Sequence, residues 1–182
     1  MFDRSTLCLA ATVVATWLAV PTVAMASEVF ACQELKAAVS DVPKGFAAHK
    51  GALSTPPNPA FKGWKTYKAK KTMTGAKTCS VVEVHLDEPQ MRLRATGYRC
   101  QFPTVLKLDK SLRAELTRCV AGEADDDPSE PNEFTIWVDR VSSGEGYRAT
   151  EVTALVNAAD GLTLSVRQSV CTNKGNGQAC ED

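Results

Sequence analysis

Apolar and polar residues alternate along the chain over residues 79–86 and again over residues 91–102. In the first run, Val82, Val84 and Leu86 share one side of an extended chain, while Glu83 and His85 point to the other side. The four residues between the two runs are polar apart from one proline, which is typical of a turn. The pattern therefore predicts a β-hairpin over residues 79–102.

The apolar positions change phase inside the second strand of this hairpin. Met91 and Leu93 lie on one side of the strand, whereas after Gly97 the apolar positions are Tyr98 and Phe102. A glycine at a change of phase is typical of a β-bulge. We therefore expect a bulge at Gly97.

Two segments carry apolar residues at the spacings of three and four that are typical of an amphipathic helix. The first runs from Glu28 to about Asp41, with Ser27 as its capping residue and Pro43 at its end. The second ends before Gly122, which stands where a glycine commonly terminates a helix. The apolar positions of this second helix are Val105, Leu108, Leu112, Leu116 and Cys119.

The predicted strands cover residues 64–69, 79–86, 91–102, 134–138, 147–156 and 162–170. Tight turns between successive strands require antiparallel neighbours. Alternating patterns, rather than continuous apolar runs, indicate a sheet that is covered on one face. The order α-β-β-β-α-β-β-β therefore predicts an α+β, two-layer domain, with one antiparallel sheet of about five to six strands covered on one face by two helices.

The first 26 residues have the features of an export signal. An apolar stretch over residues 7–20 is followed by the small residues Ala24 and Ala26, which indicate cleavage after Ala26. The stretch is shorter than the roughly 20 residues that span a bilayer. We therefore expect a signal peptide over residues 1–26 and a single disulfide-stabilised domain over 27–182. We expect no transmembrane anchor after cleavage, and a location in the periplasm or outside the cell.

The mature chain would keep an even number of cysteines, which in an exported protein indicates three disulfides. The sequence has no Cys-x-x-Cys pair and no cysteine at metal-ligand spacing from a histidine, so a zinc site is disfavoured. Spacing alone leaves the connectivity open. We favour Cys171–Cys180, which closes a short polar loop, then Cys79–Cys100, which the hairpin brings together, and Cys32–Cys119, which would tie the two helices together.

The net charge is zero, but charge is unevenly distributed along the chain. Residues 44–118 contain 15 Lys and Arg residues against 5 Asp and Glu, whereas residues 119–182 contain 4 against 12. Such asymmetry can create a dipolar surface that attracts an anionic partner. We favour the alternative, in which the two parts interleave in one sheet and neutralise each other.

Lysines are most concentrated near Trp64 and Tyr67. Lysines with interleaved aromatics can bind nucleic acids or acidic glycans, but in a half-exposed strand the aromatics would face the core and the lysines would face water. We expect no nucleic-acid partner. We predict an exposed cationic strip that contacts a protein or an anionic envelope component, unless the acidic loop at residues 125–133 folds over it. The strip consists of Lys65, Lys68, Lys70 and Lys71.

Residue types that carry catalysis are sparse. The chain has two histidines, of which His85 lies on the polar side of a predicted strand and His49 lies in a segment that fits either strand or helix. Cysteines paired in disulfides supply no thiolate nucleophile. The sequence also lacks the Gly-x-Ser-x-Gly motif of many hydrolases. These observations disfavour an enzyme.

The acidic loop offers a partial calcium motif. Asp125, Asp127 and Ser129 match the first three ligand positions of an EF-hand loop. Glu130 and Ile136 then stand where that loop needs a glycine and a bidentate glutamate. The loop is therefore interpreted as a solvated acidic segment, and we expect no metal and no cofactor.

The motifs Cys79-Ser80-Val81 and Tyr98-Arg99-Cys100, with Arg118-Cys119 ending a helix, resemble small exported bacterial proteins of unknown function. The order of elements is similar to that of type III secretion chaperone-like domains, although those are cytosolic and lack these cysteines. The resemblance implies a binding role and supplies no catalytic residues. We therefore predict an exported, non-catalytic binding or interaction module; the alternative is a small envelope enzyme, such as a hydrolase, with an unrecognised site.

Overall fold

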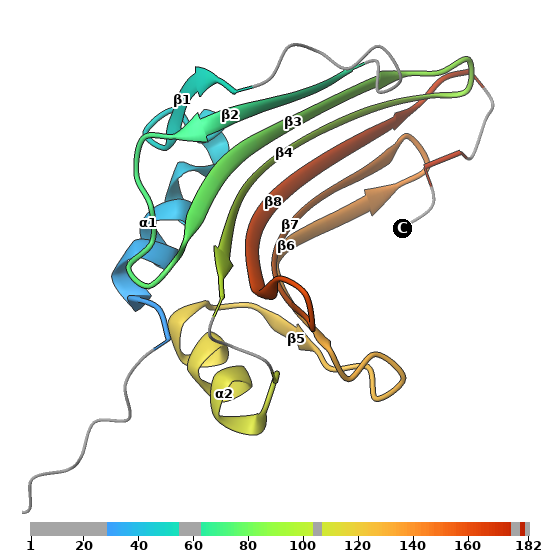
Figure 1. Cartoon of the computed structure of the whole chain (residues 1–182). Coiled ribbons are helices and arrows are strands. Elements are labelled where there is room, and N and C mark those ends of the chain that lie inside the picture. Colours follow the sequence, from blue (N-terminus) through green and yellow to red (C-terminus); the bar gives the residue numbers. More distant parts are fainter. Residues whose placement is uncertain (1–28, 55–62, 104–106, 176–178, 181–182) are drawn as a thin grey trace, which may run out of the picture.

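The computed structural model describes residues 29–54, 63–103, 107–175 and 179–180. The predicted signal peptide over residues 1–26 and the predicted cap at Ser27 lie outside the described residues. In the described part, the chain forms one large antiparallel sheet with two short helices (Figure 1).

The sheet has eight strands in the order β1-β2-β3-β4-β8-β7-β6-β5. Every neighbouring pair is antiparallel. The last strand in chain order, β8, lies at the centre of the sheet, between β4 and β7. The strands are β1 (Lys50–Leu53), β2 (Trp64–Ala69), β3 (Thr78–Asp87), β4 (Met91–Phe102), β5 (Glu123–Asp125), β6 (Glu133–Ser143), β7 (Gly146–Asn157) and β8 (Gly161–Asn173).

The prediction of a two-layer domain with five to six strands is wrong. The sheet has eight strands, and the two helices, α1 (Cys32–Asp41) and α2 (Lys110–Cys119), are too short to form a covering layer. A helix of ten residues is about 15 Å long. Strands of 10 to 13 residues are roughly 33–44 Å long. In Figure 1 both helices accordingly lie at one end of the long strands, and the β3–β4 and β6–β7 turns lie at the other.

Both helices begin later than the sequence pattern predicts. The first begins at Cys32 and continues into a short 3₁₀-helix, η1 (Val42–Lys44), in which Pro43 is accommodated. The second begins after Asp109, whose carboxylate accepts a hydrogen bond from the Leu112 N–H and so satisfies a free donor of the first turn. Leu108 is buried but precedes this helix. The helical spacing therefore predicted which residues are buried more accurately than it predicted where each helix begins.

The core lies between the helices and the helix-side halves of the strands. The helices and the turn after α1 contribute Leu35, Ala38, Phe46, Leu112 and Leu116. The sheet contributes alternating residues from five strands, because paired residues on neighbouring strands share a face. These are Val81 on β3, Tyr98, Cys100 and Phe102 on β4, Phe134 and Ile136 on β6, Val152, Ala154 and Val156 on β7, and Leu162, Leu164 and Val166 on β8.

The predicted bulge at Gly97 is wrong, because β4 pairs without interruption with β3 and with β8. The apolar positions change phase because the two halves of β4 place their apolar side chains on opposite faces of the sheet. Tyr98 faces the helices, whereas Leu93 lies on the opposite face, paired with Leu86 and Cys171. The described sheet does have an irregular register in β6, between Trp137 and Asp139.

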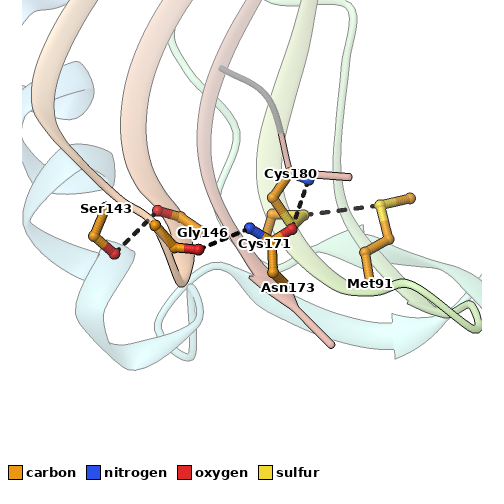
Figure 2. The surroundings of a disulfide bond; sticks show 7 residues. Met91, Ser143, Gly146, Cys171, Asn173 and Cys180 are labelled. Atoms are coloured by element: carbon orange, nitrogen blue, oxygen red, sulfur yellow. Dashed lines mark hydrogen bonds between the residues drawn. A yellow bond between two sulfur atoms is a disulfide. The ribbon is translucent and has the colours of Figure 1, made fainter. Parts of the chain in front are cut away.

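The three disulfides are Cys32–Cys119, Cys79–Cys100 and Cys171–Cys180, the pairs that the sequence favoured. Cys32–Cys119 joins the two helices, and Cys79 and Cys100 are directly opposite each other on β3 and β4. Figure 2 shows the third disulfide, where the Asn173 side chain accepts a hydrogen bond of 2.8 Å from the Cys180 N–H. This bond and the disulfide hold residue 180 against the end of β8.

Among the described residues, no helix combines the length and apolar character needed to cross a membrane.

Candidate functional site

A sharp turn after α1 brings two polar side chains together. The backbone is left-handed at Gly45, with φ of 60°, and at Phe46, with φ of 59°. For a bulky residue such as Phe46 this conformation costs roughly 1–3 kcal/mol. The Phe46 side chain is fully buried in the core, which offsets that cost. The turn returns the chain over the end of α1 and positions His49 beside Asp41.

Asp41 and His49 form a buried polar pair. Each residue is 5% exposed, and the His49 Nδ1 lies 2.8 Å from the Asp41 Oδ2. The same carboxylate oxygen accepts a hydrogen bond of 2.9 Å from the Ala48 N–H. The pair fixes the orientation of the imidazole ring. Among the described residues, we find no hydrogen-bond partner for the other ring nitrogen, Nε2.

Burial by itself would raise the pKa of Asp41, because it penalises the charged carboxylate. The hydrogen bonds from His49 and Ala48 and the positive charges of His49 and Lys44 outweigh burial, so the pKa of Asp41 lies below its ordinary value. Asp41 is therefore an ionised carboxylate at neutral pH, and it accepts a hydrogen bond from the Nδ1–H of His49.

His49 lines a surface pocket of about 420 Å³ between α1 and the loop that joins β2 to β3. Two interactions hold the wall that this loop forms. The Glu34 carboxylate accepts hydrogen bonds from the Thr74 N–H, at 2.6 Å, and hydroxyl, at 2.9 Å. The Tyr98 hydroxyl donates to the Lys71 carbonyl at 2.8 Å. The lining residues are Gln33, Glu34, Ala37, His49, Lys71, Thr72, Met73 and Tyr98.

Tyr98 forms part of the pocket floor. Its ring centroid lies 4.7 Å from that of His49, and the residue is 1% exposed. Burial, with a further contribution from the negative charge of Glu34, raises the pKa of Tyr98 to about 12. The hydroxyl therefore keeps its proton at neutral pH and acts as the donor to the Lys71 carbonyl.

The four lysines of the predicted strip are exposed but do not share one face. Lys65 pairs with Glu83, on the face that carries the core, whereas Lys68 pairs with Ser80, on the opposite face. Lys70 and Lys71 follow β2 in the loop, and of the four only Lys71 lines the pocket. No ion pair within the described part of the chain involves any of the four. They surround the end of β2 near a sheet edge.

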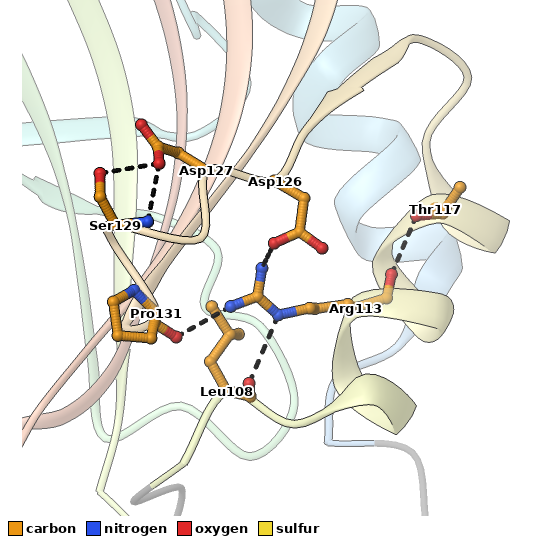
Figure 3. A network of polar contacts seen from close by, with 7 residues as sticks. All are labelled: Leu108, Arg113, Thr117, Asp126, Asp127, Ser129 and Pro131. Atoms are coloured by element: carbon orange, nitrogen blue, oxygen red, sulfur yellow. Dashed lines mark hydrogen bonds and ion pairs between the residues drawn. The ribbon is translucent and has the colours of Figure 1, made fainter.

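The acidic loop lies at the other edge of the sheet. Figure 3 shows its main attachment: Arg113 of α2 forms an ion pair with Asp126 and donates to the Pro131 carbonyl at 2.8 Å. Asp127 accepts hydrogen bonds of 2.7 Å from the Ser129 N–H and hydroxyl, and these lower its pKa. The loop is therefore attached to α2 through Arg113. The alternative that it folds over the lysines is wrong, because it follows β5, at the far edge from β1 and β2.

The expectation that the basic and acidic parts interleave is also wrong. Residues 44–118 provide β1 to β4, and residues 119–182 provide β5 to β8, so the two parts form separate halves of the sheet. Within the sheet, they are joined where β4 pairs with β8. The charge asymmetry along the sequence is thus a charge asymmetry in space. No group of three or more potential metal ligands is found among the described residues.

The sequence did not identify the Asp41–His49 pair. The two residues are eight positions apart, across a turn whose shape depends on a left-handed phenylalanine, and that conformation has no sequence signal. The only available indication was Pro43 and Gly45 between an acid and a histidine. His85 lies elsewhere, exposed on β3 and opposite Arg94.

Fold and site together define a disulfide-linked, single-sheet domain of α+β composition with a charged pocket at the end of its first helix. Comparisons of the chain with protein-family models, curated proteins and solved structures gave no match.

Proposed function

We propose that this protein is an exported, non-catalytic binding module, which contacts an anionic partner along the basic edge of its sheet. The partner is a protein or an anionic envelope component. The observation that carries the proposal is the separation of charge between the two halves of the sheet. A segregated positive surface attracts anionic partners and accelerates their association.

The acidic edge is too far away to neutralise the lysines. Five strand spacings separate β2 from β6, which corresponds to roughly 24 Å at the usual distance between neighbouring strands. Interactions between exposed charges are screened beyond about 8 Å at physiological salt. The acidic edge therefore does not compensate the positive charges of the lysines.

The arrangement of the lysines favours contact with the edge of the sheet rather than with one face. Lys65 and Lys68 extend from opposite faces of β2, and β1 covers only the end of that strand, around Tyr67 and Ala69. A partner at this edge can reach lysines from both faces together with Lys70 and Lys71. Long cationic side chains at an edge also discourage pairing with a second sheet.

The charge reversal Lys68→Glu tests the proposal. The folded protein is expected to bind immobilised heparin, used as a model polyanion, and to be released by salt, because each lysine contact displaces counterions from the polymer. Lys68→Glu should elute at clearly lower salt with a nearly unchanged melting temperature, since the side chain is exposed and makes no ion pair in the described structure. Salt-gradient chromatography and thermal unfolding provide the two measurements.

Arg148→Glu is the matched control, because it makes the same change in net charge on the acidic half of the sheet. Arg148 is exposed on β7 and pairs with Asp139. Equal losses of heparin binding in the two variants would mean that net charge alone is responsible, and would refute a binding edge at β2.

Three disulfides support the exported location, because disulfides persist mainly in oxidising compartments. Cleavage after Ala26 is expected to give a mature protein that begins at Ser27. Intact-mass measurement of protein from the envelope fraction and the medium would establish this start and distinguish periplasmic from secreted protein. A membrane-bound product that retains residues 1–26 would contradict it.

The alternative, a small envelope hydrolase, is favoured by one observation. A histidine oriented by a buried carboxylate and facing a pocket is the arrangement of a general base. We rank this alternative second because the six described cysteines are all in disulfides and so provide no thiol nucleophile. Turnover of ester or phosphoester substrates that is lost in His49→Asn would reverse this ranking.

A further inference from the structure

We propose that the pocket beside α1 binds a single oxyanion group, a phosphate or a carboxylate, through the Nε2–H of His49 and the ammonium of Lys71. This inference rests on the proposed function, since it names the place where one anionic group of the partner is held. The site is a pocket lined by a buried histidine, whereas the lysines at the sheet edge are exposed.

The histidine is preorganised for a ligand. Asp41 holds Nδ1 at 2.8 Å, and packing against Tyr98 and Phe46 fixes the ring plane. Nε2 is not among the buried polar atoms that lack a partner in the described structure, so it is open to the pocket. Within the described residues, Nε2 has no hydrogen-bond partner, and His49 lines the pocket. A ligand atom in the pocket would satisfy it.

The remaining polar groups favour an anion over a cation. Gln33, Lys71 and Thr72 also line the pocket, and each carries a hydrogen-bond donor. Glu34 is the one acidic lining residue, and both of its oxygens already accept hydrogen bonds from Thr74. Both Glu34 oxygens are therefore occupied by the loop, whereas three other lining residues carry donors.

The Asp41 carboxylate decides which charge suits the far side of the His49 ring. The imidazolium form of histidine donates from both nitrogens, so with Nδ1 bonded to Asp41 it offers Nε2–H to a ligand. An anion at Nε2, opposite Asp41, then completes a row of alternating charges. The other charged or titratable residues that line the pocket are Glu34, Lys71 and Tyr98.

The test uses the two histidines, which give separate imidazole C–H resonances in proton NMR spectra. Inorganic phosphate and acetate are titrated into the mature protein at constant ionic strength and constant pH, with chloride as the balancing ion. We expect a saturable shift of the His49 resonance and no saturable shift of the resonance of exposed His85. A response to phosphate alone would identify phosphate, and a response to both would identify oxyanions in general. Equal, unsaturable shifts of both histidines would overturn the inference.

Two variants identify the contacts. His49→Asn keeps an N–H donor for Asp41 but removes Nε2, and Lys71→Gln removes the ammonium from an exposed position where it should not affect folding. Each is expected to lower the affinity for phosphate about tenfold, the usual size of one charge-assisted hydrogen bond. Lys71→Gln is followed through the His49 resonance and His49→Asn by calorimetry. Lys70→Gln, next in sequence but outside the pocket lining, is the control. Unchanged affinity in Lys71→Gln would exclude the site as drawn.

Failure of this inference can be separated from failure of the proposed function. Heparin binding that depends on Lys68, without a phosphate effect on His49, would support the basic edge as a binding surface and refute the anion site in the pocket. Saturable phosphate binding at His49, without heparin binding, would establish the pocket and refute the edge.

Discussion

Replacing both Cys32 and Cys119 with alanine is expected to lower the free energy of unfolding by about 4–5 kcal/mol, since the disulfide closes the longest covalent loop in the protein. The two cysteines are 87 positions apart, and the bond joins α1 to α2. Cross-linking such distant residues removes much of the conformational freedom of the unfolded chain. Urea unfolding should show the loss, and thermal unfolding should show a fall of roughly 10–20 °C.

The matched control replaces Cys171 and Cys180 with alanine. These residues are 9 positions apart, so the same reasoning gives a smaller loss of about 2–3 kcal/mol. A larger loss from the short loop than from the long one would show that local contacts at the end of β8, and not loop entropy, govern stability. Unpaired thiols in the unfolded, unreduced wild-type protein would contradict the disulfides themselves.

Asp41→Ala is expected to destabilise the protein by about 3–5 kcal/mol, because it removes two hydrogen bonds to a buried carboxylate, each worth about 1.5–3 kcal/mol. The change leaves the buried Nδ1 of His49 and the Ala48 N–H without their acceptor. Asp41→Asn should cost less, because its amide oxygen can still accept one of these hydrogen bonds. Urea unfolding at neutral pH measures both variants.

The same carboxylate should make stability depend on pH. Because the pKa of Asp41 is lower in the folded protein than in the unfolded chain, its contribution is fully present above the unfolded value of about 3.9. That contribution is lost as pH falls through the lower folded value. Asp41→Asn should therefore flatten the acid side of the stability profile. Asp87→Ala is the control: this carboxylate is exposed, and its surface ion pairs with Arg92 and Lys174 are each worth at most about 1 kcal/mol, so neutral-pH stability should change little. Equal costs in Asp41→Ala and Asp87→Ala would contradict the buried pair.

The sequence predicted the long strands because alternation is a strong local signal, and it favoured two disulfides because each closes a short loop. Cys32–Cys119 was the remaining pair. The hairpin of β3 and β4, for example, follows from alternation around a turn, and it brings Cys79 opposite Cys100. Two strands were missed for a physical reason. Lys50–Leu53 and Glu123–Asp125 are short edge strands that bury little and join the sheet through backbone hydrogen bonds, so no apolar pattern marks them.

Sheet-wide properties were harder to predict. The phase change at Gly97 was correctly seen but wrongly explained, because alternation reports which side is apolar and not what covers it. The area of the sheet that a helix covers depends on the length of the helix. Both helices are shorter than predicted, because they begin only at Cys32 and Lys110. The site was missed because the Asp41–His49 contact depends on the left-handed backbone at Phe46, which only the folded chain reveals.

The central position of β8 determines when this protein can fold. Its two halves are joined along one seam, where β4 pairs over its full length with β8, and these partners are separated by 60 residues or more along the chain. Such contacts of high sequence separation form slowly. A chain emerging from the ribosome cannot complete its sheet until β8 is synthesised. The complete sheet can therefore form only late in synthesis, after Gly161–Asn173 has emerged.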